Sequence, residues 1–323
     1  MKELALELYI GVDLGGTKTK TILATGDLEI LDEKTIATRM DSEETIIQGI
    51  FETIDAIKGD RVIKAIGVAT PGQLNREAGI AIQAPSMGWH NVPIARLLCE
   101  RYHVPAYIEN DINVAALGEF SCQDESVNNA VYINVGTGIG AGIILSKKVF
   151  LGNSGTAGEF GHLTVEPNGP LCRCGNRGCL EAIAAGPAIG ARATQWARAR
   201  QDSPMHALAL QKELSAKEVG EFAQGGEQLA IELLQETGKY LGRAVADLVN
   251  LYDPGLVIFG GSVVLNSPDI WEAMLAEVKM RLMPIIYAQT EFAKARFKGD
   301  SGAIGAVVLA KQQMRAWVRT RKS

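Results

Sequence analysis

The chain has 323 residues and a formal net charge of −5; 47% of its residues are hydrophobic and 21% are charged. This composition is typical of globular proteins, excludes a disordered or fibrous chain, and allows about two domains. The mildly acidic balance argues against nucleic acid as a partner. No apolar run approaches the roughly 18 residues of a membrane span, and two acidic residues precede the first apolar run, unlike a signal peptide. We therefore expect a cytoplasmic protein with no membrane partner.

Two residue types stand out. The 35 glycines make up about 11% of the chain, against roughly 7% on average. Because they follow no Gly-X-Y period, they indicate turns in which the backbone approaches something closely. The cysteine count of five is odd, which argues against a complete disulfide framework and leaves metal binding or free thiols open.

Strand and helix signals alternate through the first third of the chain, which predicts α/β architecture. The predicted strands cover 9–12, 21–24, 62–69 and 106–108, and the predicted helices cover 42–57, 92–102 and 114–120. The first two strands flank a glycine-rich turn and therefore form a predicted hairpin. Ser42 is the expected cap of the first helix.

The opening pattern then recurs about 123 residues later. Tyr9-Ile10-Gly11-Val12 is echoed by Tyr132-Ile133-Asn134-Val135, each followed by a glycine turn and a second apolar strand. This repeat predicts two related halves that face one ligand. The later predicted elements are a long amphipathic helix, a buried strand, a closing helix and a polar surface loop, at 227–251, 256–259, 303–317 and 198–213 respectively.

The strongest local signal is a group of potential zinc ligands. His162 precedes Cys172, Cys174 and Cys179, and three thiolates with one imidazole are a tetrahedral Cys₃His set that leaves no site for water. Gly175 and Gly178 allow the loop to fold back so that all three sulfurs reach one metal. Because the closed set leaves no site for water, the zinc is predicted to be structural. The alternative is a cluster of free thiols with an unrelated histidine. We expect the remaining cysteines, Cys99 and Cys122, to be buried thiols.

Three glycine turns are candidates for phosphate binding. Their predicted ligand-binding residues are Asp13, Gly15, Gly16, Thr17 and Lys18 in the first turn, Gly136, Thr137, Gly138 and Gly140 in the second, and Gly260 and Gly261 in the third. The second turn fits G-x-G-x-x-A, but a strand follows it where a dinucleotide site needs a helix. Any one turn is equally explained by a hairpin without a ligand, but the three together favour a phosphate-bearing ligand.

Carboxylates mark the remaining candidate positions. Asp111, after a strand and before a helix, is either a helix N-cap or a general base for a hydroxyl group, with Asn110 binding the substrate. Glu159 and Glu181 flank the predicted zinc loop, where they are either solvated acids or acceptors for the hydroxyls of a polyol.

These motifs together resemble the ROK family (repressors, open reading frames and sugar kinases), specifically its glucokinase-like members. The resemblance covers nearly the whole chain in order and spacing. It rests on residues 13–18, Thr70-Pro71-Gly72, Glu109-Asn110-Asp111, residues 135–142, Gly158-Glu159-Phe160-Gly161-His162, the 172–181 loop and Gly260-Gly261.

The resemblance implies an actin-like ATPase fold of the hexokinase type, with two α/β domains and a cleft between them. The small domain would comprise 1–118 and the returning helix at 301–323, and the large domain 119–300 with the zinc loop. Asp111 matches the catalytic base, and the substrate-binding set would be Gly72, Asn110, Asp111, Glu159, His162 and Glu181. The turns at 13–18 and 136–142 match the phosphate-binding segments, and Gly260-Gly261 matches the adenosine side.

The implied reaction is ATP-dependent phosphorylation of a hexose with Mg²⁺ and structural Zn²⁺, and the preferred substrate is glucose. Ser86-Met87 replaces the Asn-Leu of many members, so N-acetylmannosamine, fructose, allose and N-acetylglucosamine remain alternatives. A sugar-responsive regulator is a further alternative, but only twelve residues precede Asp13, and we expect no helix-turn-helix there. The resemblance also implies a homodimer or homotetramer.

Overall fold

The computed structural model describes residues 6–84 and 87–320, with side chains to residue 316, so Pro85 and Ser86 lie outside the described residues. The chain divides into two compact units. Unit 1 comprises 1–124, 149–157 and 296–323, and unit 2 comprises 125–148 and 158–295. Unit 1 thus extends beyond the expected boundary at 118, resumes at 296 instead of 301, and takes in the 149–157 segment.

Unit 1 is built on a five-stranded sheet of order β3-β2-β1-β4-β8. Its strands are β1 (Leu8–Leu14), β2 (Lys18–Thr25), β3 (Ile30–Ala37), β4 (Ile63–Thr70) and β8 (Ala106–Asn110). β1 and β2 pair antiparallel, which confirms the predicted hairpin, and β1, β4 and β8 run parallel. A small sheet of β5 (Gln73–Asn75), β6 (Ile80–Ala84) and β7 (Trp89–Val92) was not predicted.

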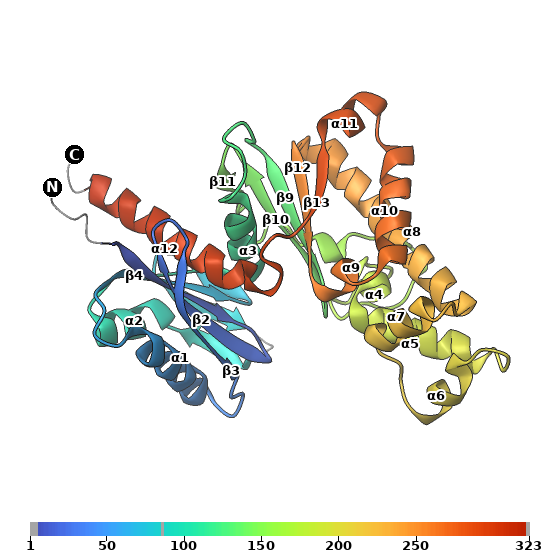
Figure 1. Cartoon of the computed structure of the whole chain (residues 1–323), viewed down its shortest axis with the longest axis horizontal. Helices are drawn as coiled ribbons and strands as arrows, with labels where there is room; N and C mark the ends of the chain where they lie inside the picture. Colours follow the sequence, from blue (N-terminus) through green and yellow to red (C-terminus); the bar gives the residue numbers. More distant parts are fainter. Residues whose placement is uncertain (1–5, 85–86, 321–323) are drawn as a thin grey trace. The chain divides into compact units, whose positions relative to one another are not determined.

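Helices cover both faces of this sheet (Figure 1). They are α1 (Glu43–Lys58), α2 (Ile94–Tyr102), α3 (Asp111–Phe120) and α12 (Ser301–Thr320). Ser42 caps α1 in a capping box with Thr45, as predicted for the cap. Apolar residues of α1 and α2 pack on one face, while α12 packs on the other. α12 packs directly on the backbone of β1 and β4, so glycine is required at Gly11 and Gly67. A Cβ at either position would overlap a carbonyl oxygen of α12.

Unit 2 repeats the strand order of unit 1. Its sheet has the order β11-β10-β9-β12-β13, with β9 and β10 antiparallel and β9, β12 and β13 parallel. The strands are β9 (Ala130–Val135), β10 (Ile139–Leu145), β11 (Lys148–Val149), β12 (Leu256–Gly260) and β13 (Glu291–Lys294). The predicted repeat is confirmed, since β9 and β10 occupy the places in this order that β1 and β2 occupy in unit 1.

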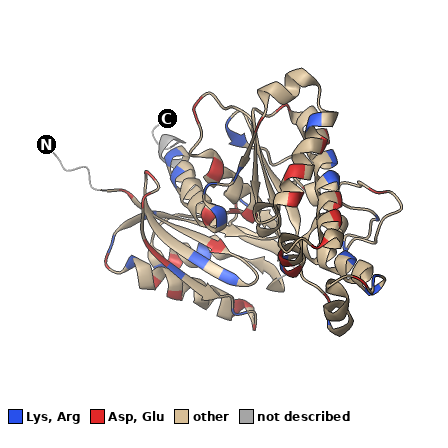
Figure 2. Cartoon of the chain, turned by 45° about the vertical axis from the view of Figure 1, so that its right-hand side comes forward, with Lys and Arg blue, Asp and Glu red and all other residues tan. Residues whose placement is uncertain are grey.

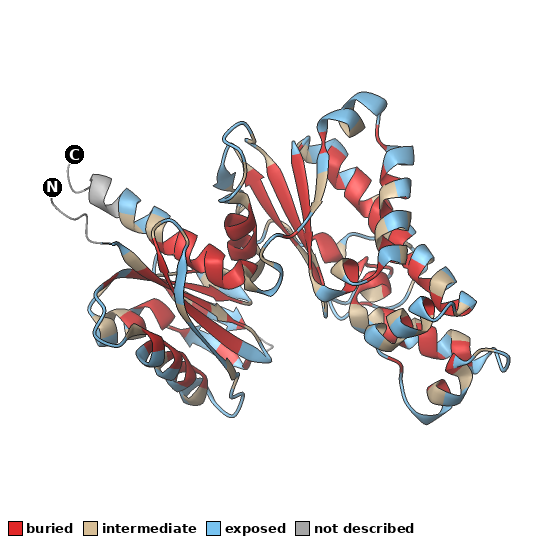
Figure 3. Cartoon of the chain, in the orientation of Figure 1, coloured by how far each residue is buried: buried red, intermediate tan, exposed pale blue. Residues whose placement is uncertain are grey.

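The helices of unit 2 enclose a large aliphatic core (Figure 3). They are α4 (Glu181–Ala184), α5 (Gly186–Arg198), α6 (Met205–Gln211), α7 (Ala216–Gln224), α8 (Gln228–Tyr252), α9 (Ser262–Leu265), α10 (Pro268–Arg281) and α11 (Pro284–Gln289). α8 confirms the long predicted helix. It packs so closely on α10 that a Cβ at Gly242 would lie 2.6 Å from Glu277 Cβ.

Two expectations from the sequence are wrong. The segment 198–213 was expected to be a surface loop, but it contains α6, whose Met205 and Ala209 are completely buried. Cys122 was expected to be buried and is exposed, because it follows the end of α3, and Cys99 is only half-buried.

The charges are mixed. Lys and Arg are interspersed with Asp and Glu along the ribbons of both units (Figure 2). Among the described residues, no helix is both long and apolar enough to cross a membrane.

Candidate functional site

The carboxyl ends of three parallel strands bring the first group of predicted residues to one edge of the unit 1 sheet. Asp13 lies beside Ala69 in the β1–β4 register, and Thr70 lies beside Asn110 in the β4–β8 register. Asp13 on β1 and Asn110 on β8, with Asp111 directly after it, therefore lie at the same edge of the sheet, on the two strands that flank β4. Such edges are where ligands bind in open α/β sheets.

Asn110, and not Asp111, caps helix α3. The side-chain oxygen of Asn110 accepts hydrogen bonds from the backbone N–H groups of Ile112 at 3.0 Å and Asn113 at 3.4 Å. Asp111 is the first helical residue, and its Oδ1 accepts from Ile112 N at 2.9 Å. The interpretation of Asp111 as the N-cap is therefore wrong. Its carboxylate is held half-buried at the positive end of α3, where a negative charge is stabilised.

Asp13 lies where β1 runs into the first glycine turn. The turn is closed by a bond from Gly15 N to Lys18 O, and Thr38 donates to Gly15 O at 2.7 Å. Burial and, next, the negative charge of Asp111 raise the pKa of Asp13 from 3.8 to about 6, while Lys18 lowers it. Two acidic side chains thus act on each other at this edge, an arrangement that favours a cation.

Glycine is also required at Gly302, which packs against the Asp13 side chain. A Cβ at Gly302, at the start of α12, would lie 2.5 Å from Asp13 Oδ2. Gly72, the other predicted ligand-binding glycine of unit 1, has a φ of +95°, and a side chain there would overlap the backbone of β6. Glycine at Gly72 is therefore explained by the small sheet alone.

In unit 2, Glu181 closes the second glycine turn. Gly136 N donates to Gly138 O at 2.9 Å, and Glu181 Oε2 accepts from Ile139 N at 3.0 Å. A Cβ at Gly138 would lie 2.8 Å from that carboxylate oxygen. Thr137 completes the turn, and Gly140 lies within β10. The strand after this turn confirms that the G-x-G-x-x-A match is not a dinucleotide site.

The segment that carries Glu159 and His162 packs on the edge of β10. Gly158 has a φ of +94°, and a Cβ there would overlap Ala141 O; a Cβ at Gly161 would overlap Ile139 O. The two glycines are therefore required for this close approach. Glu159 Oε2 lies 3.8 Å from His162 Nε2, and its side chain is 68% exposed, so it is accessible to a ligand.

The predicted metal ligands converge. One ligand atom from each of His162, Cys172, Cys174 and Cys179 lies within 4.8 Å of the others. The sulfurs of Cys174 and Cys179 are 3.7 Å apart, and Cys172 Sγ is 3.7 Å from His162 Nδ1. Two sulfurs bound tetrahedrally at about 2.3 Å from one zinc lie about 3.7–3.8 Å apart. The spacing therefore fits a closed zinc site.

The backbone of the loop explains this convergence. Gly175 and Gly178 have φ values of +94° and +69°, which favour glycine, as predicted. Cys172 N donates to Asn176 O at 2.7 Å, which closes the turn that carries Cys172 and Cys174. Burial raises the pKa of the Cys179 thiol to about 12, so this sulfur keeps its proton unless a cation displaces it.

The third glycine turn opens onto a cavity within unit 2. Gly261 has a φ of +86°, and a Cβ there would overlap Val135 O, so the turn lies against the end of β9. Ser262, directly after it, lines a cavity of about 530 Å³. The walls come from α5, α7, α8, α9 and α10, and include Lys217, Glu221, Gln224 and Asn266. The volume is that of a small-molecule site.

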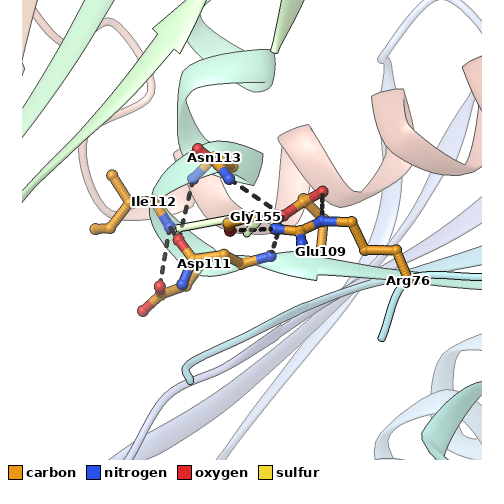
Figure 4. A network of polar contacts seen from close by, with 7 residues as sticks. Arg76, Glu109, Asp111, Ile112, Asn113 and Gly155 are labelled. Carbon is orange, nitrogen blue, oxygen red and sulfur yellow. Dashed lines mark hydrogen bonds and ion pairs between the residues drawn. The ribbon is translucent and has the colours of Figure 1, made fainter. Parts of the chain in front are cut away.

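Sequence reasoning missed one buried ion pair beside Asn110. Arg76 binds Glu109 through two bonds of 2.6 Å each (Figure 4). Glu109 lay within a recognised motif but was given no role. A charged residue at the end of an apolar strand needs a partner when it is buried. Glu109 therefore indicated that a cationic side chain lies beside it, but not which one.

Fold and site together define an α/β protein with repeated glycine hairpins, a carboxylate-bearing strand edge and a Cys₃His loop. The ROK family model matches residues 9–313, and the chain belongs to the ROK family. It is 32% identical over 309 residues to a glucokinase of Thermotoga maritima, covering 94% of this chain and 98% of that protein. It is also 31% identical to an N-acetylmannosamine kinase of Haemophilus influenzae, covering 94% and 95%.

Solved structures agree with this assignment. A ROK hexokinase from Thermus thermophilus matches with a TM-score of 0.82 and 32% identity, over 96% of this chain and 99% of that one. A ROK glucokinase from Streptomyces griseus in complex with glucose and AMPPNP matches with a TM-score of 0.80 and 30% identity, over 94% and 99%. The predicted actin-like ATPase fold is confirmed.

Proposed function

We propose that this protein transfers the γ-phosphate of ATP to the 6-hydroxyl of glucose, with Asp111 as the general base. That it is an ATP-dependent sugar kinase follows from its family and from its similarity to glucokinases along nearly its whole length. The choice of glucose is supported by the glucokinases among its relatives, although an N-acetylmannosamine kinase is almost as similar.

The observation that carries the proposal is the position of Asp111 in unit 1. It is the first residue of α3, directly after the end of β8 that carries Asn110, and its charge acts on Asp13 of β1, on the other side of β4. In the proposed reaction Asp111 takes the proton of the sugar hydroxyl as its oxygen bonds to the γ-phosphorus. The bond from that phosphorus to the bridging oxygen of ADP breaks.

Asp13 is the residue that would hold Mg²⁺ through water. Burial and, next, the charge of Asp111 raise the pKa of Asp13 and so disfavour its negative charge, and a divalent cation would offset both effects. When bound, Mg²⁺ neutralises charge on the phosphates. Lys18 and the backbone N–H groups of Gly16 and Thr17 would orient the phosphates from unit 1, while the N–H of Gly15 holds the turn closed by donating to Lys18 O.

In unit 2 we assign the phosphate-binding role to the turn at 136–138 and the adenosine role to the cavity beside Gly260 and Gly261. The cavity supports this because it combines apolar walls with polar side chains that can recognise a base. Asn110, Asp111, Glu159, His162 and Glu181 are the proposed sugar ligands. The zinc site would hold the backbone that carries the last three of these, without entering the chemistry.

The test is ADP release with Mg²⁺ and ATP, measured for glucose, mannose, fructose, allose, N-acetylmannosamine and N-acetylglucosamine. We expect glucose to have the highest kcat/KM. Asp111→Asn should bind the sugar but lower kcat by about 10²–10⁴-fold. The matched control is Asp55→Asn, which replaces an exposed aspartate of α1 that binds Arg101.

Two outcomes would contradict different parts of the proposal. Sugar-dependent ADP release by Asp111→Asn at the wild-type rate would refute the role of Asp111 as the general base. A higher kcat/KM with N-acetylmannosamine than with glucose would refute only the choice of sugar.

A further inference from the structure

A buried ion pair stands directly behind the proposed base. Arg76, in the loop after β5, donates from Nε to Glu109 Oε2 and from a terminal nitrogen to Oε1, at 2.6 Å each (Figure 4). The side chain of Glu109 is 7% exposed and that of Arg76 is 21% exposed. A bidentate contact of this kind fixes the orientation of the carboxylate as well as its distance from the arginine, which a lysine cannot do.

Glu109 passes this constraint to the strand end and to the helix. Its Oε1 also accepts from the backbone N–H of Asn110 at 2.8 Å and from Asn113 Nδ2 at 3.1 Å. The last residue of β8 and the first turn of α3 are thus held by one carboxylate oxygen. Asp111 lies between Asn110 and Asn113 along the chain, so its position depends on that of Glu109.

Arg76 also holds a second segment. It donates to Gly155 O at 3.1 Å. Gly155 has a φ of +78°, and a Cβ there would overlap the Arg76 guanidinium. The segment 149–157 belongs to unit 1, whereas residues 148 and 158 belong to unit 2. Glu159, a proposed sugar ligand, follows this segment after one intervening residue.

Stability alone is a weak reason for such a pair. Desolvating two charges costs about as much as their attraction returns, so buried ion pairs add little net stability compared with apolar residues. Their contribution is geometric. In phosphoryl transfer, where the protein mainly positions the reactants, a displacement of about 1 Å costs up to about 10²-fold in rate.

We propose that Arg76 is a positioning residue for phosphoryl transfer. Through Glu109 it fixes Asn110 and Asp111, and through Gly155 it fixes the stretch of chain that leads to Glu159. This inference rests on the proposed kinase function and adds to it the residue that sets the geometry of two sugar-binding segments.

The test compares Arg76→Gln with Arg281→Gln in the full-length protein. Arg281 is the matched control because its Nε also lies 2.6 Å from a buried glutamate, Glu277, whose side chain is 6% exposed, but in helix α10. For Arg76→Gln we expect kcat to fall about 10- to 100-fold and the glucose KM to rise several-fold, with the ATP KM unchanged within about twofold. For Arg281→Gln we expect kinetic constants within about twofold of wild type.

A second variant keeps the arginine but displaces it. Gly155→Ala should show the same kinetic pattern. The double variant should lose no more kcat than Arg76→Gln alone, because both changes disrupt the same contact, the one between Arg76 and residue 155. Where Arg76→Gln does not fold, Arg76→Lys takes its place in the same comparison, since it keeps the charge and loses the paired contact.

Three results would overturn the inference. They are an unchanged kcat per folded molecule in the Arg76 variant, an equal kinetic loss in Arg281→Gln, or fully additive losses in the double variant. The failure of the proposed function is distinguishable, because the wild type itself would then release no sugar-dependent ADP.

Discussion

Replacing Asp13 by asparagine should stabilise the free protein while abolishing its activity. Asp13 is held half-buried in unit 1, and its carboxylate is opposed first by burial and next by the charge of Asp111. At neutral pH the folded protein must carry this unfavourable charge, whereas the unfolded chain carries it in water. Asparagine keeps the shape of the side chain and removes the charge.

The magnitude follows from the pKa. A change from 3.8 in the unfolded chain to about 6 in the folded protein corresponds to about 3 kcal/mol. Between these values the folded state binds more protons than the unfolded state. The wild type therefore loses stability as the pH rises from about 4 to about 6 and gains none above it. We expect Asp13→Asn to be about 1–3 kcal/mol more stable above this range and close to wild type below it.

The assay is urea unfolding of both proteins at several pH values from about 4 to about 8. The difference in free energy of unfolding should increase through the range in which Asp13 titrates in the folded protein. Mg²⁺ with a non-hydrolysable ATP analogue should then stabilise the wild type more than the variant. A variant that is less stable than wild type at neutral pH, or a difference that is independent of pH, would refute the reasoning.

Two further predictions concern unit 2. Cys174→Ser should lower the metal content from about one zinc per chain and raise the sugar KM at least about tenfold. Cys122→Ser, at an exposed position, should leave the metal content and the sugar KM unchanged. About one zinc per chain in both the wild type and Cys174→Ser, by elemental analysis, would contradict the four-ligand site. Gly261→Ala, which forces a side chain into Val135 O at a φ of +86°, should weaken ATP binding at least about tenfold, measured by calorimetry, compared with Gly255→Ala, where a Cβ has only one neighbour within 4 Å, at 3.9 Å. Equal affinities in those two glycine variants would contradict the proposed role of the turn.

Elements with strong periodicity were predictable from the sequence, and elements held by tertiary contacts were not. The apolar stripe of α8 and the hairpin of β1 and β2 are local patterns, and both were predicted. α6 was missed because only Met205 and Ala209 of its seven residues are buried, which leaves too weak a helical period. β6 was missed because a strand of only five residues gives little periodic signal of its own. It is defined instead by pairing with β5 and β7.

The site divides in the same way. The convergence of His162 with the three loop cysteines was predictable because cysteine and glycine spacing determines a loop over a short stretch. The capping role of Asn110 was not, since Asn and Asp are equally good caps and only the backbone places one of them at that position. Arg76 had no local signal at all. Its relation to Glu109 spans 33 residues and arises only when β5 and β8 are brought together.

The repeated strand order also allows the two proposed phosphate turns to be compared position by position. Asp13 follows Val12 at the end of β1, and in the repeat Gly136 follows Val135 at the end of β9. The same scaffold therefore presents a carboxylate in one turn and bare backbone in the other. The nearest carboxylate to the second turn, Glu181, is already bonded to Ile139 N. Because carboxylates repel a triphosphate unless a cation lies between them, the proposed roles differ in the same way: the turn at Asp13 would need Mg²⁺, and the turn at 136–138 would bind phosphate through backbone N–H groups.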